Sequence, residues 1–565
     1  MTTTYERLIE GLPARASPQG DAPAGARAVR ERVAHLPLAS PELATREIGA
    51  LLENMLGTLW TGGERIEALE ALRAPVASLC EGYERLLQTE SHPLPPAKAR
   101  LAEAALDFQR RLARNYALAV HELCSPAGGV PFLKRRTVVQ ALVRALEHGR
   151  AALLWSYRLY RAPPAGLWQQ MHALYRFAAE AGLDTRRADG EAASGAAATD
   201  ARDAYAHALL LALSNPYRYS LRELADAEVL TRWLAPHAAL GAARGDGAAF
   251  ALDADADRGP GYLPEEREAG RTGQLAVDVA PVLATLAREI ALRPPADESI
   301  VLRTRDRGSV QLARAFVERV VHGWAGGVPA RGHARIGAVH ELDTVIGMHG
   351  LHYVLAGRMD FEQFMQRARG AAITLGAQAH AAAWAAAGGD AARLTAQRAR
   401  VVDQSLGGYR LLWEAGNAVR TRIGELVGLA LPQAEGEPQE WMVGVLRWLR
   451  IDGDGRVDAG VELLARRALA AGVRALDADG AARTPMRGVL LRDDAGAATD
   501  LLVPALFDRT TRTLEVARQE HPDDWRGAPC VERYDAVAVG DASSAYYRVS
   551  LALSAAAAAG DAIEN

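Results

Sequence analysis

The chain has 565 residues, which is too long for one ordinary hydrophobic core, so we expect two to four domains. Its 65 basic and 69 acidic residues give a net charge of −4, which excludes a general electrostatic attraction to nucleic acid or to anionic lipid. An anionic ligand would therefore have to be held by a local cluster of arginines.

The number of cysteines and the hydropathy of the chain indicate in which cellular compartment the protein is expected. Cys80, Cys124 and Cys530 are far apart, and an odd, sparse count fits a reducing environment. The first residues lack the basic and apolar regions of a signal peptide. No segment reaches the roughly 18 uncharged apolar residues that a membrane-spanning helix needs. The sequence therefore predicts a cytoplasmic protein with no membrane span.

The N-terminal part of the chain shows helical periodicity. In residues 41–60 the apolar side chains recur three and four positions apart, as on one face of a helix. Residues 98–123 and 133–160 repeat this pattern, and Pro- and Gly-rich breaks separate the segments. We predict a helical domain over residues 1–235.

The next segment is predicted to be a mixed region of helix and loop, residues 236–328, that connects the two halves of the chain. Residues 245–270 contain few large apolar side chains and are predicted to be a loop. Helices are predicted at residues 277–292 and 309–324.

β-Strand patterns dominate after residue 329. The Asp452-Gly-Asp-Gly455 sequence predicts a hairpin turn, and both faces of the strand before it carry apolar residues, as in a small barrel that a helix covers. Strand-like runs occur at residues 335–340, 344–354, 400–412, 422–429, 441–451 and 456–464.

We predict a barrel domain over residues 329–475, with 463–475 as the covering helix. Residues 360–399 are rich in alanine and are predicted to be a helical insertion that loops out of this barrel. A further β-rich region is predicted over residues 484–555.

Two short motifs stand at the edges of predicted strands. Arg331 and Arg335 form an R-x-x-x-R motif, and Asp403, Ser405 and Gly408 form a D-x-S-x-x-G motif. Each motif is weak alone, because arginine pairs are usually solvated and Asp, Ser and Gly occur in any turn. Their order, their positions at strand edges and the Trp-containing strand that follows them make the combination informative.

Together these motifs resemble the ligand signature of PilZ domains, over about residues 331–470. The resemblance implies an α+β multidomain protein, in which an all-helical N-terminal half precedes a PilZ-like antiparallel β-barrel with a helical insertion and a C-terminal β-rich region. The motifs lie 68 residues apart (403 − 335), more than is usual in the family, so the insertion must loop out. The ligand of the family is the bacterial second messenger cyclic di-GMP, and no cofactor is expected.

The residue types suit that ligand. An arginine can bind phosphate oxygens with two nitrogens, read the O6 and N7 atoms of guanine, or stack on a purine. Asp403 could accept hydrogen bonds from the N1–H and amino groups of guanine, and Ser405 offers an adaptable hydroxyl. Gly408 permits a turn and a close backbone approach, because it has no Cβ.

Other sites are disfavoured. His349 and His352, on a predicted strand, would point to opposite faces, so we expect no metal site there. The sequence contains no phosphate-binding loop, nucleophile elbow or His-Glu-x-x-His motif, and gives no reason to expect an enzyme. The basic run at residues 303–307 is interpreted as a solvated surface rather than a nucleic-acid site.

Two hypotheses remain open. In the first, the PilZ-like barrel binds cyclic di-GMP and signals through the helical half to a protein partner, because the arm at Arg331–Arg335 joins the two parts. In the second, the protein is a helical interaction scaffold whose barrel is structural and binds no nucleotide. A titration with cyclic di-GMP distinguishes them.

Overall fold

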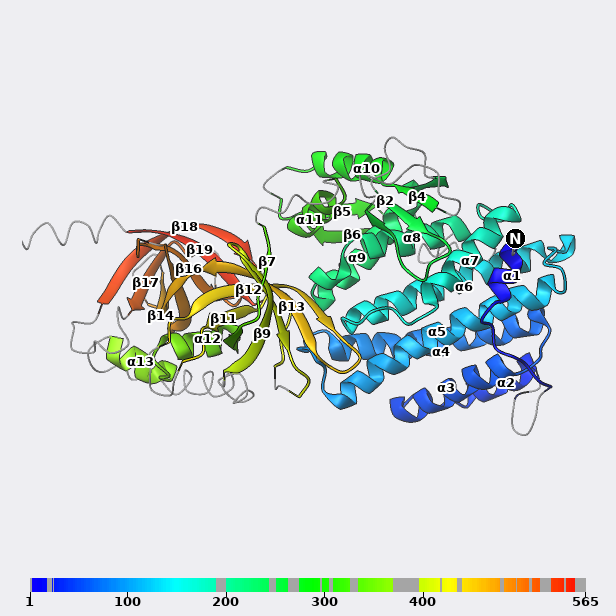
Figure 1. Ribbon diagram of the computed structural model, residues 1–565, viewed down its shortest axis with the longest axis horizontal. Helices are drawn as coiled ribbons and strands as arrows, with labels where there is room; N and C mark the ends of the chain where they lie inside the picture. The colour runs from blue at the N-terminus through cyan, green and yellow to red at the C-terminus, as the bar shows by residue number, and fades with distance from the viewer. Residues whose placement is uncertain are drawn as a thin grey trace, which may run out of the picture. The chain divides into compact units, whose positions relative to one another are not determined.

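The computed structural model divides into two compact units, one made of Met1–Glu90 with Leu94–Ala330 and one of Ser91–Pro93 with Arg331–Asn565. Figure 1 shows the elements of both. Residues 3–17, 23, 25–188, 200–242, 250–262, 274–294, 297–303, 308–325, 334–368, 396–416, 419–433, 439–477, 482–493, 495–507, 511–518, 530–542 and 545–553 are described.

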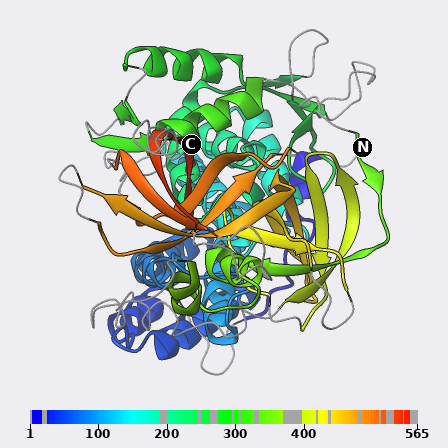
Figure 2. The same cartoon turned by 90° about the vertical axis from the view of Figure 1, so that its left-hand side faces the viewer.

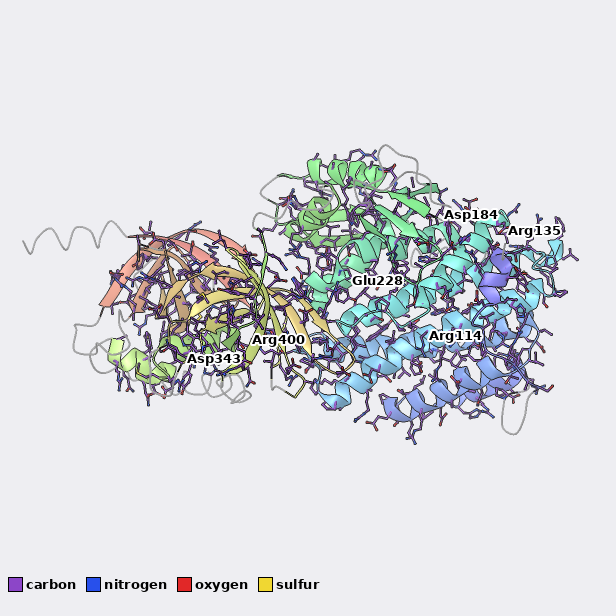
Figure 3. The ribbon with its side chains drawn as sticks, in the orientation of Figure 1. Arg114, Arg135, Asp184, Glu228, Asp343 and Arg400 are labelled. Carbon is purple, nitrogen blue, oxygen red and sulfur yellow. The ribbon has the colours of Figure 1, made fainter. Side chains whose placement is uncertain are left out.

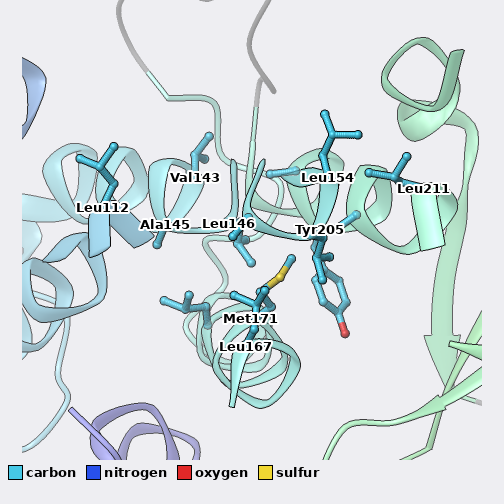
Figure 4. Close-up of a cluster of buried hydrophobic side chains, with 14 of the residues drawn as sticks. Leu112, Val143, Ala145, Leu146, Leu154, Leu167, Met171, Tyr205 and Leu211 are labelled. Carbon is cyan, nitrogen blue, oxygen red and sulfur yellow. The ribbon is translucent and has the colours of Figure 1, made fainter. Parts of the chain in front are cut away.

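The first unit is mainly helical, as the periodicity predicts. Its core lies between long helices whose alanine-rich faces pack closely: a Cβ added at Gly149 would lie 3.0 Å from the Met171 side chain. Figure 4 shows Leu146 and Met171 directed toward each other in this core, with Tyr205 beside them. The helices are α1 (Thr4–Ile9), α2 (Ala26–Ala34), α3 (Pro41–Gly57), α4 (Gly62–Leu87), α5 (Pro96–Cys124), α6 (Arg135–Arg158), α7 (Leu167–Glu180), α8 (Ala201–Leu213) and α9 (Leu221–Leu234).

A buried arginine joins three of these helices. Arg65 on α4 is fully buried, and its guanidinium donates to both carboxylate oxygens of Glu122 on α5, at 2.9 and 2.7 Å. It also donates to the Asn115 side chain and to the Met55 and Thr58 carbonyl groups. A buried charge is tolerated when it is paired and fully hydrogen-bonded, so this network fixes the end of α3 against α4 and α5.

The region predicted to connect the two halves belongs to the helical unit. Leu302, Phe316 and Trp324 are buried in the same core as the helices. The two predicted helices begin later than expected, because strands precede them. The elements are a sheet in the order β1 (Ala239–Ala242), β4 (Gln274–Asp278), β2 (Phe250–Asp253) and β3 (Gly261–Tyr262), the hairpin β5 (Ser299–Arg303) with β6 (Ser309–Ala313), and helices α10 (Ala280–Ala291) and α11 (Arg314–Ala325).

The second unit contains two closed barrels of six antiparallel strands each (Figure 2). In the first barrel the order is β8-β9-β10-β13-β12-β11, and closure comes from the pairing of β9 with β10. The short strand β7 adds to the outside of β9. The bounds are β7 (Ile336–Gly337), β8 (Glu341–Ile346), β9 (Gln397–Ser405), β10 (Gly408–Trp413), β11 (Leu426–Ala430), β12 (Met442–Ile451) and β13 (Val457–Ala465).

The second barrel follows in the order β14-β15-β16-β19-β18-β17. The helix predicted at residues 463–475 is wrong, because this segment ends β13 and forms β14, which pairs on both edges with β15 and β17. Residues 467–475 therefore belong to the second barrel rather than the first. The bounds are β14 (Arg467–Leu476), β15 (Met486–Arg492), β16 (Ala498–Pro504), β17 (Thr513–Arg518), β18 (Cys530–Ala542) and β19 (Tyr546–Leu553).

A helix, α12 (Gly347–Leu355), lies between the two barrels, where a strand was predicted over 344–354. Gly347 turns the chain at φ 84°, and the apolar residues that follow recur at helical spacing. Leu351 packs in one buried cluster with Val443 and Val445 of the first barrel and residues of the second, Val489 among them. The two barrels consequently share a core.

The predicted insertion is only partly within the described residues. Helix α13 (Phe361–Ala368) lies outside the first barrel and packs through Phe364 and Met365 on Ala470 and Ala517 of the second. Residues 369–395 are outside the described part of the chain, and 397–399 belong to β9 rather than to a helix. Within the described residues, no helix is both long enough and apolar enough to cross a bilayer.

His352 on α12 provides a test of the shared core. It is 1% exposed between the rings of Phe361 and Phe364, and burial, with the nearby Arg487 charge, lowers its pKa to about 3. The unfolded chain takes up a proton near pH 6.5, whereas the folded protein does not. The stability that depends on a neutral His352 is therefore fully present above pH 6.5 and is lost as the pH falls toward 3.

We predict that protonation of His352 in the unfolded chain lowers the free energy of unfolding by about 2 kcal/mol between pH 6.5 and 5, at about 1.4 kcal/mol per pH unit. His352→Phe should remove that share of the pH dependence in chemical denaturation, whereas His349→Gln on the same helix should keep it. Identical pH profiles for the His352→Phe and unmodified proteins would contradict the burial of a neutral imidazole.

Candidate functional site

The D-x-S-x-x-G motif forms the hairpin between β9 and β10. Asp403 and Ser405 are in the last residues of β9, a two-residue turn follows, and Gly408 begins β10. Gly408 is paired with Ser405, and the Ser405 hydroxyl lies 3.5 Å from the Gly408 carbonyl oxygen. The motif thus lies at one rim of the first barrel.

Gly408 has a structural reason to be glycine. Its φ is +156°, and a Cβ at this position would lie 2.1 Å from the backbone oxygen of Val461 on β13. No side chain fits in that distance, so the close approach of β10 to β13 depends on the missing Cβ. This requirement holds with or without a ligand.

The structure brings Arg335 and Asp403 together. Strand β7 pairs with β9 so that Gly337 lies opposite Asp403, and the Arg335 Nη1 atom is 3.0 Å from the Asp403 Oδ1 atom. The Arg335 side chain is 41% exposed and that of Asp403 is 19% exposed. Arg331, the other arginine of the motif, lies outside the described residues.

A second arginine faces Asp403 across the hairpin. Arg410 on β10 is the cross-strand partner of Asp403, with its Nη1 atom 4.0 Å from Asp403 Oδ2. Asp458 on β13 holds the Arg410 guanidinium with two hydrogen bonds of 2.9 and 2.7 Å, which raise the Arg410 pKa above its usual value. The guanidinium also lies 5.9 Å from the centre of the Trp448 ring. Charges of both signs therefore alternate along this rim.

The comparison with known families bears on this geometry. Residues 27–244 match the model of the N-terminal domain of the cyclic-di-GMP receptor FimW, and residues 249–400 and 389–469 match the model of its middle PilZ domain. The chain contains a PilZ domain. The matched residues include the six strands of the first barrel, the added strand β7 and both motifs.

A curated relative extends this similarity along the chain. The cyclic-di-GMP receptor FimW of Pseudomonas aeruginosa is 25% identical over 486 residues, which covers 79% of this chain and 78% of that protein. The PilZ match ends at residue 469, so most of the second barrel lies beyond it.

Sequence reasoning missed Arg410, Asp458 and Trp448 near the PilZ motifs. A signal was present for Arg410, because a two-residue turn at 406–407 places residues 403 and 410 opposite each other. The hairpin of β12 and β13, which carry Trp448 and Asp458, is indicated by its turn sequence, but the pairing of β13 with β10 that brings Asp458 to Arg410 is not specified by any local pattern.

The other candidate sites gain no support as ligand sites. His349 and His352 lie on helix α12 and not on a strand as predicted. Among the residues that the structure describes, no group of His, Cys, Asp and Glu side chains has a metal-binding arrangement. In the helical unit a polar cavity of about 290 Å³ is lined by Arg7, Arg176 and Asp255, and both arginines already pair with that aspartate.

Gly408→Ala should destabilise the PilZ barrel by about 1–3 kcal/mol, because the new methyl group forces β10 away from β13. Chemical denaturation measures this change. Gly337→Ala, in the neighbouring strand β7, is the matched control: its Cβ would meet no atom within 4 Å, and stability should change by less than about 0.5 kcal/mol. Equal stability of the two variants would mean that β10 and β13 are not in such close contact.

Proposed function

We propose that this protein is a cyclic di-GMP receptor, and that its PilZ domain binds the ligand through Arg331, Arg335, Asp403, Ser405 and Gly408. The observation that carries the proposal is the Arg335–Asp403 ion pair at the rim of the barrel, since it joins two motifs that are 68 residues apart (403 − 335). The resemblance to a protein named as a cyclic di-GMP receptor supports it. No catalytic activity or cofactor is part of the proposal.

Ligand binding would exchange this ion pair for contacts to the dinucleotide. The phosphates attract the guanidinium of Arg335, and the donor edge of a guanine satisfies the carboxylate of Asp403. Both side chains are accessible enough for the exchange, because Arg335 is 41% exposed and Asp403 is 19% exposed. An exposed ion pair contributes little to stability, so opening it costs little.

The surroundings of the pair suit a flat, anionic ligand. Ile336 and Leu406 are 68% and 71% exposed at the same rim, where they could cover the face of a base. Arg410 differs from Arg335, because two hydrogen bonds to Asp458 hold it in place. We expect Arg335 to move toward the ligand and Arg410 to keep its position.

We further propose that the receptor acts in the cytoplasm and passes its state to a protein partner through the helical unit. The arm that carries Arg331 and Arg335 is the covalent connection between the last helix of that unit and β7. A ligand that binds the connecting segment acts on both parts that it joins, which is a recurrent means of signalling. The rival hypothesis is a helical scaffold with a barrel that binds no nucleotide.

Arg331→Ala and Arg335→Ala should each weaken cyclic di-GMP binding by about 1.5–3 kcal/mol in isothermal titration, the range for charge-assisted hydrogen bonds. Thermal unfolding without ligand should hardly change. Arg398→Ala is the matched control, because Arg398 is on β9, the strand of Asp403, but pairs with Asp343 away from the motif. If the unmodified protein shows no saturable binding of cyclic di-GMP, the scaffold hypothesis is favoured.

Asp403→Ala tests whether the site reads guanine. Cyclic di-AMP has the same phosphates, but adenine offers no N1–H or 2-amino group, so a carboxylate that faces it is left without donors. The unmodified protein should strongly prefer cyclic di-GMP, and the variant should lose affinity for it and narrow the difference between the two ligands. Equal binding of both by the unmodified protein, with steep weakening by salt, would mean a simple phosphate trap.

A further inference from the structure

The turn between α5 and α6 exposes two large apolar side chains in succession. Phe132 and Leu133 lie on a short 3₁₀ turn, Phe132–Lys134, and are 78% and 93% exposed. In the part of the chain that the structure describes, no other two consecutive large hydrophobic residues are both exposed. Single exposed apolar residues are common on soluble proteins, whereas a protruding pair usually indicates an interaction.

Cationic residues follow this pair directly. Lys134, Arg135 and Arg136 come next, and residues 123–146 contain no Asp or Glu. Within the described residues, no carboxylate forms an ion pair with Lys134 or Arg135. The guanidinium of Arg135 instead lies 5.5 Å from the centre of the Phe132 ring.

These cations stand where a helix disfavours them. Helix α6 begins at Arg135, and its first turn contains no acidic residue. The N-terminal end of a helix carries a partial positive charge, so cations there reduce stability and acidic residues increase it. The start of α6 therefore lacks the stabilisation that acidic residues would provide, and it follows directly on the turn that exposes Phe132 and Leu133. A position at which the sequence departs from the usual preference of a helix end often marks a functional site.

The start of the connection between α5 and α6 is packed against helix α1. A Cβ at Gly128 would lie 2.5 Å from the Tyr5 ring, so α1 packs directly on the start of this connection. The Tyr5 hydroxyl is 2.8 Å from Nδ1 of His121 on α5. The base of the connection is thereby fixed, and Figure 3 shows Arg135 at the end of the helical bundle.

We propose that Phe132 and Leu133 insert into the surface of an anionic lipid bilayer while Lys134, Arg135 and Arg136 bind its headgroups. Apolar side chains beside a cluster of cations are the combination that binds such interfaces, through burial of apolar area and attraction to anionic lipid. A stable protein interface needs about 800 Å² of complementary surface from each partner. Two side chains on a three-residue turn supply less, whereas a bilayer needs no matching shape.

Flotation of the full-length protein with vesicles tests this proposal. Binding should be strong with phosphatidylcholine that contains phosphatidylglycerol and weak with phosphatidylcholine alone. The double variant Phe132→Ser/Leu133→Ser should bind at least about ten-fold more weakly, and Lys134→Gln and Arg135→Gln about five-fold each. All four side chains are exposed, so thermal stability should not fall, and loss of a cation at the start of α6 should leave it unchanged or slightly raised.

The matched control is Leu506→Ser in the β-rich unit, because Leu506 is also 93% exposed but is not followed by consecutive basic residues. It should bind vesicles like the unmodified protein. Equal binding to both kinds of vesicle, no binding to either, or undiminished binding by the Phe132→Ser/Leu133→Ser variant would overturn the proposal. If this variant instead loses only a complex with another protein, the turn is a protein-docking site and the lipid assignment is wrong.

Discussion

Both edges of β9 are paired, and this pairing determines the barrel and its rim. On one edge, β8 pairs with residues 397–400, and β7 continues the same line to residues 403 and 404. On the other edge, β10 closes the barrel. The segment that carries Arg335 is therefore an extension of the wall beside β9, and it places the arginine next to Asp403 by main-chain hydrogen bonds. A slip of one residue would turn Asp403 to the opposite face and separate the two motifs.

The charged groups at the rim differ in kind from the buried pair in the helical unit. Arg335, Asp403, Arg410 and Asp458 are all partly exposed, and the single contact between Arg335 and Asp403 is weaker than the two hydrogen bonds that hold Arg410 to Asp458. Arg65 and Glu122 are enclosed, and loss of either would leave a buried charge without compensation. An arginine–carboxylate pair thus fixes the helices in the first unit, whereas the Arg335–Asp403 pair in the second unit is open to water.

Local signals in the sequence explain which predictions succeeded. The hairpin at Asp452–Gly455 was predicted correctly, because turn chemistry depends on neighbouring residues, and it joins β12 to β13. The helices α3 to α6 were predicted for a similar reason, because helical periodicity is also a local pattern. The segments 344–354 and 463–475 failed because their local preference was ambiguous or was overridden. Alanine favours helix in residues 467–475, yet pairing on both edges makes this segment strand β14. Asp458 reaches Arg410 through strand pairing, which no local pattern reveals.

The short connection between the two barrels restricts insertions and deletions at this point of the chain. Strand β13 ends at Ala465 and β14 begins at Arg467, so a single residue joins the two barrels. Successive side chains of a strand point to opposite faces, so the insertion or deletion of one residue here would exchange the inward and outward sets of one barrel. Length changes at this junction would therefore be excluded, whereas loops elsewhere can lengthen at little cost.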